Sequence, residues 1–297
     1  MGGRQHRSFA AERTEVDGPD SPQLRVLSAV SPGKHVGQRG EDVQAGQRVL
    51  AKGRALRPQD LGLLSSIGLA EALVHRRPRV AIIATGSELL PPGSPPAGCR
   101  IADANTPMLT ALSRRDGGEV VATRLVEDDP QKILAAARQE ADVLLVSGGS
   151  SVGEEDHAPL LLARHGSLAI HGVAMRPSSP TGMGRLDAAL VFLLPGNPVS
   201  CLCGYDFFAG RAIRALGGGK RDWPYRRRRV QLERKISSQV GRVDYARVRI
   251  VDDLAAPLAI GGASILTSTT RADGFVIVPG DSEGFPPGAV VDVFLYD

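Results

Sequence analysis

A chain of 297 residues is long enough to form two or three domains, each with its own hydrophobic core. Hydrophobic residues make up 42% and charged residues 23% of it, which is typical of globular proteins and excludes an extended disordered or collagen-like chain. No run of 18 apolar residues occurs and the N-terminus is polar, so we expect neither a membrane span nor a secretory signal, and a cytoplasmic location.

The net charge of +4 is unevenly distributed and does not by itself indicate a nucleic-acid partner. Residues 79–218 carry 12 basic and 14 acidic residues, whereas residues 219–297 carry 12 and 10. The conspicuous basic run, Arg226 to Arg229, has no aromatic stacking platform, so we favour a solvated strand over a nucleic-acid surface. The three cysteines and six histidines show neither a disulfide framework nor the spacing of zinc ligands.

The N-terminal quarter of the chain predicts little regular structure. Residues 1 to about 33 are rich in Arg, Glu, Ser and Pro, with one expected strand at 24–30. Turn residues around short apolar pieces at 40–50 predict small antiparallel strands. Pro58-Gln59-Asp60 before an apolar run predicts a helix that stops at Gly68. We therefore expect a truncated β and linker domain over residues 1–78.

From Arg79 onward, apolar strands alternate with amphipathic helices, which is typical of a mostly parallel sheet covered on both faces. Strands are expected at 80–84, 119–123, 143–146, 168–173 and 189–194. Helices are expected at 106–115 after an Asn105 cap, 130–140 after an Asp129 cap, 158–164 and 199–216. The pattern predicts an α/β domain over residues 79–218.

The last part of the chain predicts strands only. After Gly217-Gly218-Gly219, strands are expected at 230–236, 246–251, 275–278 and 290–295. A small β-barrel or sandwich over residues 219–297 is the expected result.

The most informative segment is the glycine-rich stretch at 147–156, directly after the apolar strand at 143–146. Its glycines let backbone amides approach an anion closely, its hydroxyls add donors, and Asp156 offers a hard oxygen ligand. The alternative is a strand-to-helix turn whose acid only caps the next helix.

Carboxyl ends of parallel strands meet at one edge of a sheet, so loops far apart in the sequence can face one ligand. The candidate ligand-binding residues in these loops are Thr85, Gly86, Ser87, Ser147, Gly148, Gly149, Ser151, Gly153, Pro195, Gly196, Asn197 and Ser200. The candidate metal-ligating acids are Glu88, Asp128 and Asp156, and Mg²⁺ is the simplest metal for them. For each turn, a purely structural role is the competing interpretation.

For Arg176, in the proline-stiffened loop at 175–180, the alternatives are a bidentate phosphate contact and a solvated surface cation.

Several motifs, in order along the chain, resemble the molybdopterin molybdenumtransferases, namely the bacterial MoeA type and the E domain of gephyrin. These motifs are Thr85-Gly86-Ser87-Glu88-Leu89, Asp103-Ala104-Asn105, the segment 147–153 with Asp156, the segment 173–177 and the segment 194–200. The resemblance extends from about Gly33 to the C-terminus.

The resemblance implies a three-layer α/β/α domain with a mostly parallel sheet, flanked by a partial N-terminal β domain and a C-terminal β-barrel. It implies that molybdate is inserted into adenylylated molybdopterin with Mg²⁺-assisted loss of AMP. Glu88, Asp128 and Asp156 then serve as catalytic residues that handle metal and molybdate, Arg176 lies near substrate phosphate, and 147–153 cradles the pterin phosphate or its adenylate. A homodimer and a molybdopterin adenylyltransferase partner are expected on the same ground.

The chain also departs from the family pattern. The family's Ser-Ala-Met-Asp-Gly-Tyr-like motif and its Met-Thr-Gly segment do not occur, so we expect the chain to begin partway through the second domain of the family. Gly172 and Ser179 stand where lysines are usual, and Ser150 replaces a valine. Each lost cation weakens anion binding. The alternatives to an enzyme are a non-catalytic molybdopterin-binding module that has lost catalysis with the N-terminal portion, and a scaffold of the kind that the gephyrin resemblance implies.

Overall fold

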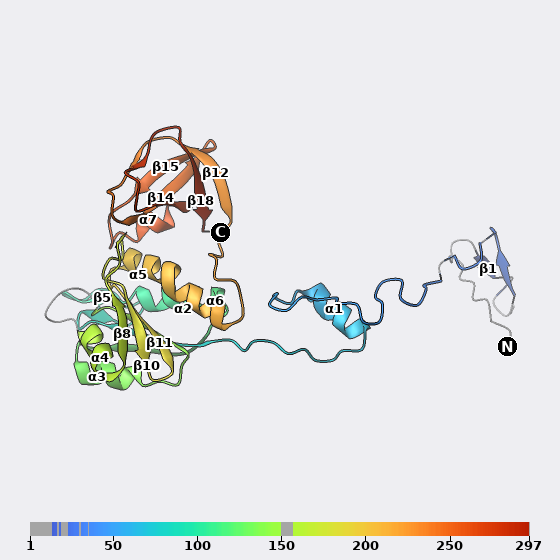
Figure 1. The fold of residues 1–297 in the computed structure, drawn as a ribbon, viewed down its shortest axis with the longest axis horizontal. Coiled ribbons are helices and arrows are strands. Elements are labelled where there is room, and N and C mark those ends of the chain that lie inside the picture. Colours follow the sequence, from blue (N-terminus) through green and yellow to red (C-terminus); the bar gives the residue numbers. More distant parts are fainter. Residues whose placement is uncertain are drawn as a thin grey trace. The chain divides into compact units, whose positions relative to one another are not determined.

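The computed structural model describes residues 14–16, 18, 23–29, 31–34, 36–149 and 157–296. The chain divides into two compact units, Met1–Gly68 and Leu69–Asp297 (Figure 1). Each unit is described by itself.

The first unit contains a short hairpin and one helix. Strands β1 (Thr14–Val16) and β2 (Leu24–Val26) pair antiparallel, and helix α1 (Pro58–Ser66) ends just before Gly68, as predicted. The expected small strands at 40–50 are wrong, because residues 36–57 form turns. Gly40 and Gly46 have φ angles of +79° and +80°, which bend the chain locally instead of extending it.

The second unit is built around a six-stranded sheet in the order β6-β3-β7-β11-β10-β8. Its strands are β3 (Arg79–Thr85), β6 (Glu119–Val126), β7 (Val143–Ser147), β8 (Ser167–His171), β10 (Gly182–Leu186) and β11 (Ala189–Leu194). Neighbours among β6, β3, β7 and β11 are parallel, whereas β10 runs antiparallel to both β11 and β8. The mostly parallel sheet is thus confirmed, and the carboxyl ends of four strands share one edge.

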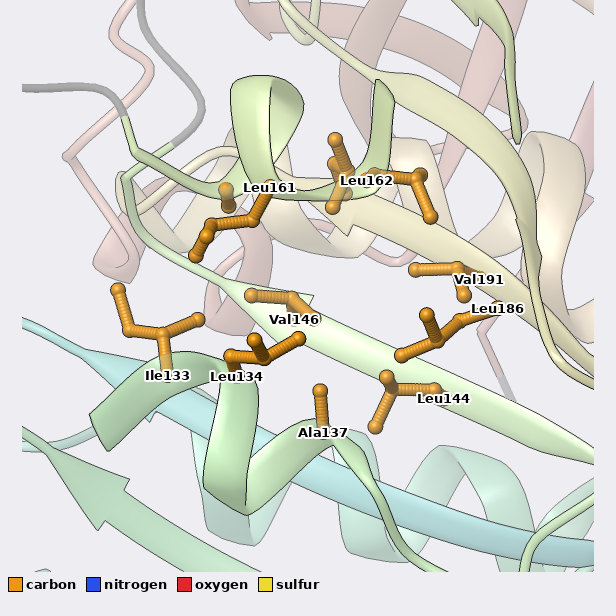
Figure 2. Close-up of a pocket in the computed structure, with 11 residues that line it drawn as sticks. Ile133, Leu134, Ala137, Leu144, Val146, Leu161, Leu162, Leu186 and Val191 are labelled. Atoms are coloured by element: carbon orange, nitrogen blue, oxygen red, sulfur yellow. The ribbon is translucent and has the colours of Figure 1, made fainter. Parts of the chain in front are cut away.

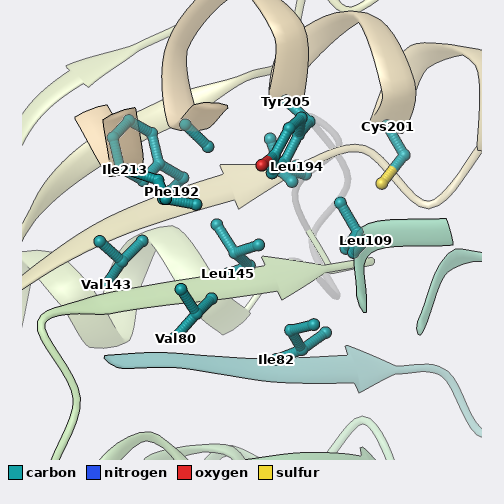
Figure 3. Packing of buried hydrophobic residues seen from close by; sticks show 11 residues of the cluster. Val80, Ile82, Leu109, Val143, Leu145, Phe192, Leu194, Cys201, Tyr205 and Ile213 are labelled. Carbon is teal, nitrogen blue, oxygen red and sulfur yellow. The ribbon is translucent and has the colours of Figure 1, made fainter. Parts of the chain in front are cut away.

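Helices cover both faces of this sheet. Helix α2 (Asn105–Arg115) and a continuous helix made of α5 (Pro198–Gly204), a π-helical turn (Tyr205–Ala209) and α6 (Gly210–Leu216) pack on one face. Figure 3 shows this core, in which Val80, Ile82 and Leu145 of the strands face Leu109, Tyr205 and Ile213 of the helices. The predicted three-layer arrangement follows from the alternation of apolar residues to the two faces of each strand.

The opposite face is covered by α3 (Pro130–Ala137) and α4 (His157–His165). A cavity of about 30 Å³ remains between these helices and the sheet, and Figure 2 shows only carbon side chains around it, among them Ile133, Leu144 and Leu162. A space this small without polar lining is a gap in packing, and it offers no group that could orient a ligand.

The C-terminal part of the second unit is a closed β-barrel. Strands β12 (Arg227–Leu232), β14 (Val243–Val251), β15 (Leu254–Ala259), β16 (Gly274–Val278) and β18 (Val290–Leu295) form it. Strand β15 pairs with both β12 and β14, which closes the ring and decides for a barrel over a sandwich. The expectation of strands only is wrong at one place, since Thr267–Thr270 form the short helix α7. Smaller strand pairs are β4 (Leu89–Leu90) with β5 (Ile101–Ala102) and β13 (Ile236–Ser237) with β17 (Gly284–Phe285).

Candidate functional site at the carboxyl edge of the sheet

The loops after β7 and β11 are joined by the side chain of Asn105. Its amide nitrogen Nδ2 donates to Ser147 Oγ at 2.8 Å and to the backbone oxygen of Gly196 at 2.7 Å. Asn105 was expected to cap helix α2, but it is the first helical residue. The N-cap residue, Ala104, has no capping side chain, and the preceding Asp103 satisfies the start of the helix: its Oδ1 accepts from the backbone amides of Asn105 at 2.8 Å and Thr106 at 3.0 Å.

Asn105 is therefore a site residue that sequence reasoning missed. Asn105 is 7% exposed and Asp103 is 4% exposed, so the hydrogen bonds of both side chains are inside the protein. The sequence did carry a signal for this role: a polar residue stands at the start of a helix, on the edge of the sheet where the other loops gather.

The glycines after β7 are required by close packing against β3. A Cβ atom at Gly148 would lie 2.2 Å from the backbone oxygen of Thr85, and the φ of Gly148 is +99°. The amide of Gly148 donates to the backbone oxygen of Leu194 at 3.1 Å, which ties the same residue to β11. The loops after β3, β7 and β11 thus meet at Gly148, as the parallel sheet predicted.

A second connection joins the loops after β3 and β6. The amide of Ser87 donates to Asp128 Oδ2 at 3.3 Å, and the amide of Asp128 donates back to Ser87 Oγ at 3.4 Å. Glu88 and Asp128 are both exposed, and the Glu88 carboxylate lies against Gly86, where a Cβ would be 2.8 Å from Oε2. Asp129 caps α3 by accepting from the amide of Lys132 at 2.8 Å, which confirms its structural interpretation.

Two of the three expected metal-ligating acids, Glu88 and Asp128, lie on adjacent loops at this edge. Asp156, together with the expected ligand-binding residues Ser151 and Gly153, lies outside the described residues. Within the described ranges, no three acidic, histidine or cysteine side chains gather closely enough to hold a metal ion. The described carboxylates supply hard oxygen donors of the type that Mg²⁺ prefers, and their ligand role stays a prediction.

The loop after β11 contacts the barrel as well as the sheet. The amide of Val199, in the first turn of α5, donates to the backbone oxygen of Ala263 at 2.9 Å. This amide is therefore not free for an anion, whereas the turn formed by Pro195, Gly196 and Asn197 borders Gly148. Ser200 is 4% exposed in the same turn of helix.

A buried thiol lies beneath Ser147. Cys201 Sγ is 3.7 Å from Ser147 Oγ, and burial raises the pKa of the Cys201 thiol to about 12. At neutral pH the thiol is protonated, so Cys201 packs beneath the site without acting as a nucleophile.

Arg176 does not lie free in solvent. It belongs to β9 (Met175–Arg176), which pairs parallel with β14 of the barrel, and its guanidinium forms an ion pair with Asp244. Asp244 is completely buried and also accepts from Ser238 Oγ at 2.8 Å. A phosphate contact by Arg176 stays a prediction, and it would have to compete with this carboxylate.

Three sequence profiles of known families match the chain. They are the MoeA N-terminal region (domain I and II) at residues 9–68, a probable molybdopterin binding domain at 81–215, and the MoeA C-terminal region (domain IV) at 229–296. The chain is 34% identical over 292 residues to molybdopterin molybdenumtransferase 2 of Mycobacterium tuberculosis, with 93% of this chain and 70% of the relative covered. The chain belongs to the molybdopterin molybdenumtransferase (MoeA) family.

Other relatives agree with this assignment to the MoeA family. A putative molybdopterin biosynthesis protein of Methanocaldococcus jannaschii is 32% identical over 285 residues, which cover 92% of this chain and 68% of the relative. The solved structure of the molybdopterin biosynthesis MoeA protein from Pyrococcus horikoshii is similar with a TM-score of 0.76 at 30% identity, covering 96% of this chain and 71% of that one. The chain thus belongs to an enzyme family of molybdenum cofactor biosynthesis and has the MoeA fold. Across the described residues, no helix is both long and apolar enough to cross a membrane.

Proposed function

We propose that this chain inserts molybdenum from molybdate into adenylylated molybdopterin, with Mg²⁺-assisted release of AMP. The observation that carries the proposal is the junction at Asn105, whose amide joins Ser147 to Gly196 at 2.8 and 2.7 Å. This junction holds glycine backbones and hydroxyls from separate strands at one edge, which is the usual place for a phosphate-bearing ligand in such a sheet.

Each loop has a separate role in this proposal. The turn at Gly148 and Gly149 would bring backbone close to the phosphate of the substrate, and Ser151 and Gly153 are assigned to the same role from the sequence. The turns at Thr85 to Ser87 and at Pro195 to Ser200 bind the remaining polar groups of the substrate.

Glu88, Asp128 and Asp156 are the residues that would hold Mg²⁺. The ion would offset the negative charge of these carboxylates beside a phosphate and polarise the phosphoryl oxygens. The exposure of Glu88 and Asp128 fits this role, since neither carboxylate is paired with a cation in the described part of the chain.

One observation favours the non-catalytic binding module. The loop at 172–181 has Arg176 as its cation, and Asp244 already neutralises that charge. A loop without a free cation stabilises developing negative charge poorly, although the glycine turns can still bind the ligand.

A direct assay separates the two functions. The purified chain is mixed with adenylylated molybdopterin, molybdate and Mg²⁺, and AMP release and active cofactor are measured. Release of AMP with formation of cofactor supports the transferase. Tight binding without AMP release identifies a binding module, and the absence of both contradicts the two proposals.

A further inference from the structure

Among the buried polar atoms that have no hydrogen-bond partner within the described residues, two belong to residues that border the segment Ser147–Gly149. They are Oγ1 of Thr85 and Oδ1 of Asn105, residues that are 3% and 7% exposed. Buried polar groups are nearly always paired, because leaving one unpaired costs free energy that folding must offset. Two atoms that each lack a hydrogen-bond partner at the edge of a proposed binding site point to a ligand that supplies those partners.

Both residues lie against the segment Ser147–Gly149. A Cβ at Gly148 would be 2.9 Å from Thr85 Oγ1, and one at Gly149 would be 3.1 Å from it. Asn105 contacts the same segment through Ser147 Oγ. The two residues that carry the unpaired atoms therefore border one stretch of backbone from different elements, β3 and α2.

The orientation of the Asn105 amide is determined by its neighbours. The backbone oxygen of Gly196 can only accept, so the group 2.7 Å from it must be the Nδ2 donor. Oδ1 is consequently the free atom, and a carbonyl oxygen can only accept a hydrogen bond. Thr85 Oγ1 can accept or donate.

These properties select the chemistry of the group that binds. A phosphate oxygen placed on Asn105 Oδ1 would bring two acceptors together, which is repulsive, whereas an N–H or O–H group satisfies the oxygen. We propose that Thr85 and Asn105 form a neutral subsite that receives a hydrogen-bond donor of the substrate, such as the N–H of its heterocycle, while phosphate binds elsewhere along the edge. The inference rests on the proposed function, since it assigns one part of that substrate.

The decisive variant is Thr85→Val, which keeps the side-chain shape and removes the unpaired hydroxyl. Because no hydrogen bond is lost in the free protein, the thermal midpoint should stay the same or rise. Affinity for adenylylated molybdopterin, measured by equilibrium binding, should fall by about 3- to 10-fold, which is the range expected for one neutral hydrogen bond. The loss should be equal at low and high salt, because a contact between neutral groups is not screened.

Two companion variants make the result specific. Thr85→Ser keeps the hydroxyl and should restore affinity. Thr269→Val removes a buried hydroxyl that does have a partner, the backbone oxygen of Leu266 at 2.6 Å, in helix α7 of the barrel. It should lower the thermal midpoint and leave affinity unchanged, the opposite of Thr85→Val.

Each contrary result has a distinct meaning. Unchanged affinity of Thr85→Val, with normal binding by the unmodified protein, overturns the neutral subsite alone. A loss that disappears at high salt shows that the bound group is charged, and it also overturns the subsite. No binding by the unmodified protein overturns the proposed function, and the subsite with it.

Discussion

Arg176 and Asp244 form an ion pair that joins a loop of the α/β domain to the β-barrel. The two residues are directly paired in register between β9 and β14, and the Asp244 side chain is fully buried while that of Arg176 is 33% exposed. Arg242 lies near the same carboxylate, with Nε 3.4 Å from Asp244 Oδ1. The sequence alternatives for Arg176, a phosphate contact or a solvated cation, did not include this partner, which is 68 residues away.

Substitution Asp244→Asn should destabilise the protein. It removes the charge that compensates Arg176, so we expect the free energy of unfolding to fall by about 2–3 kcal/mol, below the range for fully buried pairs because Arg176 is partly exposed. Urea denaturation measures the change. The matched control is Asp253→Asn, which breaks the exposed pair with Arg228 and should alter stability by less than about 0.5 kcal/mol. Equal effects of the two substitutions would contradict the structural role.

Substitution Gly148→Ala should be among the most damaging single changes in the site. The added Cβ would meet the backbone oxygen of Thr85 at 2.2 Å, and the positive φ disfavours any side chain. We therefore expect the free energy of unfolding to fall by about 3 kcal/mol. Gly117→Ala is the control, because Gly117 has a φ of +86° and nothing within 4 Å of its Cβ position. The free energy of unfolding of that variant should fall by only about 1 kcal/mol, because backbone strain is its sole cost. Thermal or urea unfolding of both variants tests the difference.

The stability of the protein should depend on the ionisation of Asp206. Burial raises the pKa of this carboxyl from 3.8 to about 6, although Arg115, 3.1 Å away, and Tyr225 partly offset the effect. The folded state therefore holds a proton that the unfolded state has released. The resulting stabilisation is full below pH 3.8 and is lost as pH rises through about 6, a change on the order of 2–3 kcal/mol.

The measurement compares Asp206→Asn, which cannot ionise, with the unmodified protein. The difference in unfolding free energy between them should change across the interval from pH 3.8 to about 6 and be constant above it. Curves that stay parallel through this interval would show that Asp206 keeps an ordinary pKa.

Neighbouring acids after β6 should differ in their effect on activity. Asp128→Asn removes one proposed Mg²⁺ ligand, so AMP release should fall at least about tenfold and need more Mg²⁺ for half-maximal rate. Asp129→Asn keeps the oxygen that accepts from the amide of Lys132 and should leave both quantities unchanged. Equal rates for the two variants at limiting Mg²⁺ would rule out the ligand role of Asp128.

Much of the fold could be predicted because apolar runs mark buried strands. Strands β3, β7 and β11 are fully apolar where the prediction placed them, and their burial on both faces explains the signal. Strand β10 was missed because it contains Gly182 and Gly184. At Gly184 a Cβ would lie 1.9 Å from the backbone oxygen of Ser167, so packing against β8, rather than hydrophobicity, determines the residue.

By itself the sequence determined most of the strands and helices of the α/β domain, the edge at which the glycine turns gather, and the family resemblance. These properties depend on local patterns that each segment carries alone. The tertiary structure decided which side chains meet: Asn105 with Ser147 and Gly196, and Arg176 with Asp244. Such pairs join residues between 42 and 91 positions apart, and a one-dimensional pattern has no signal for a hydrogen bond whose geometry depends on how the whole sheet packs.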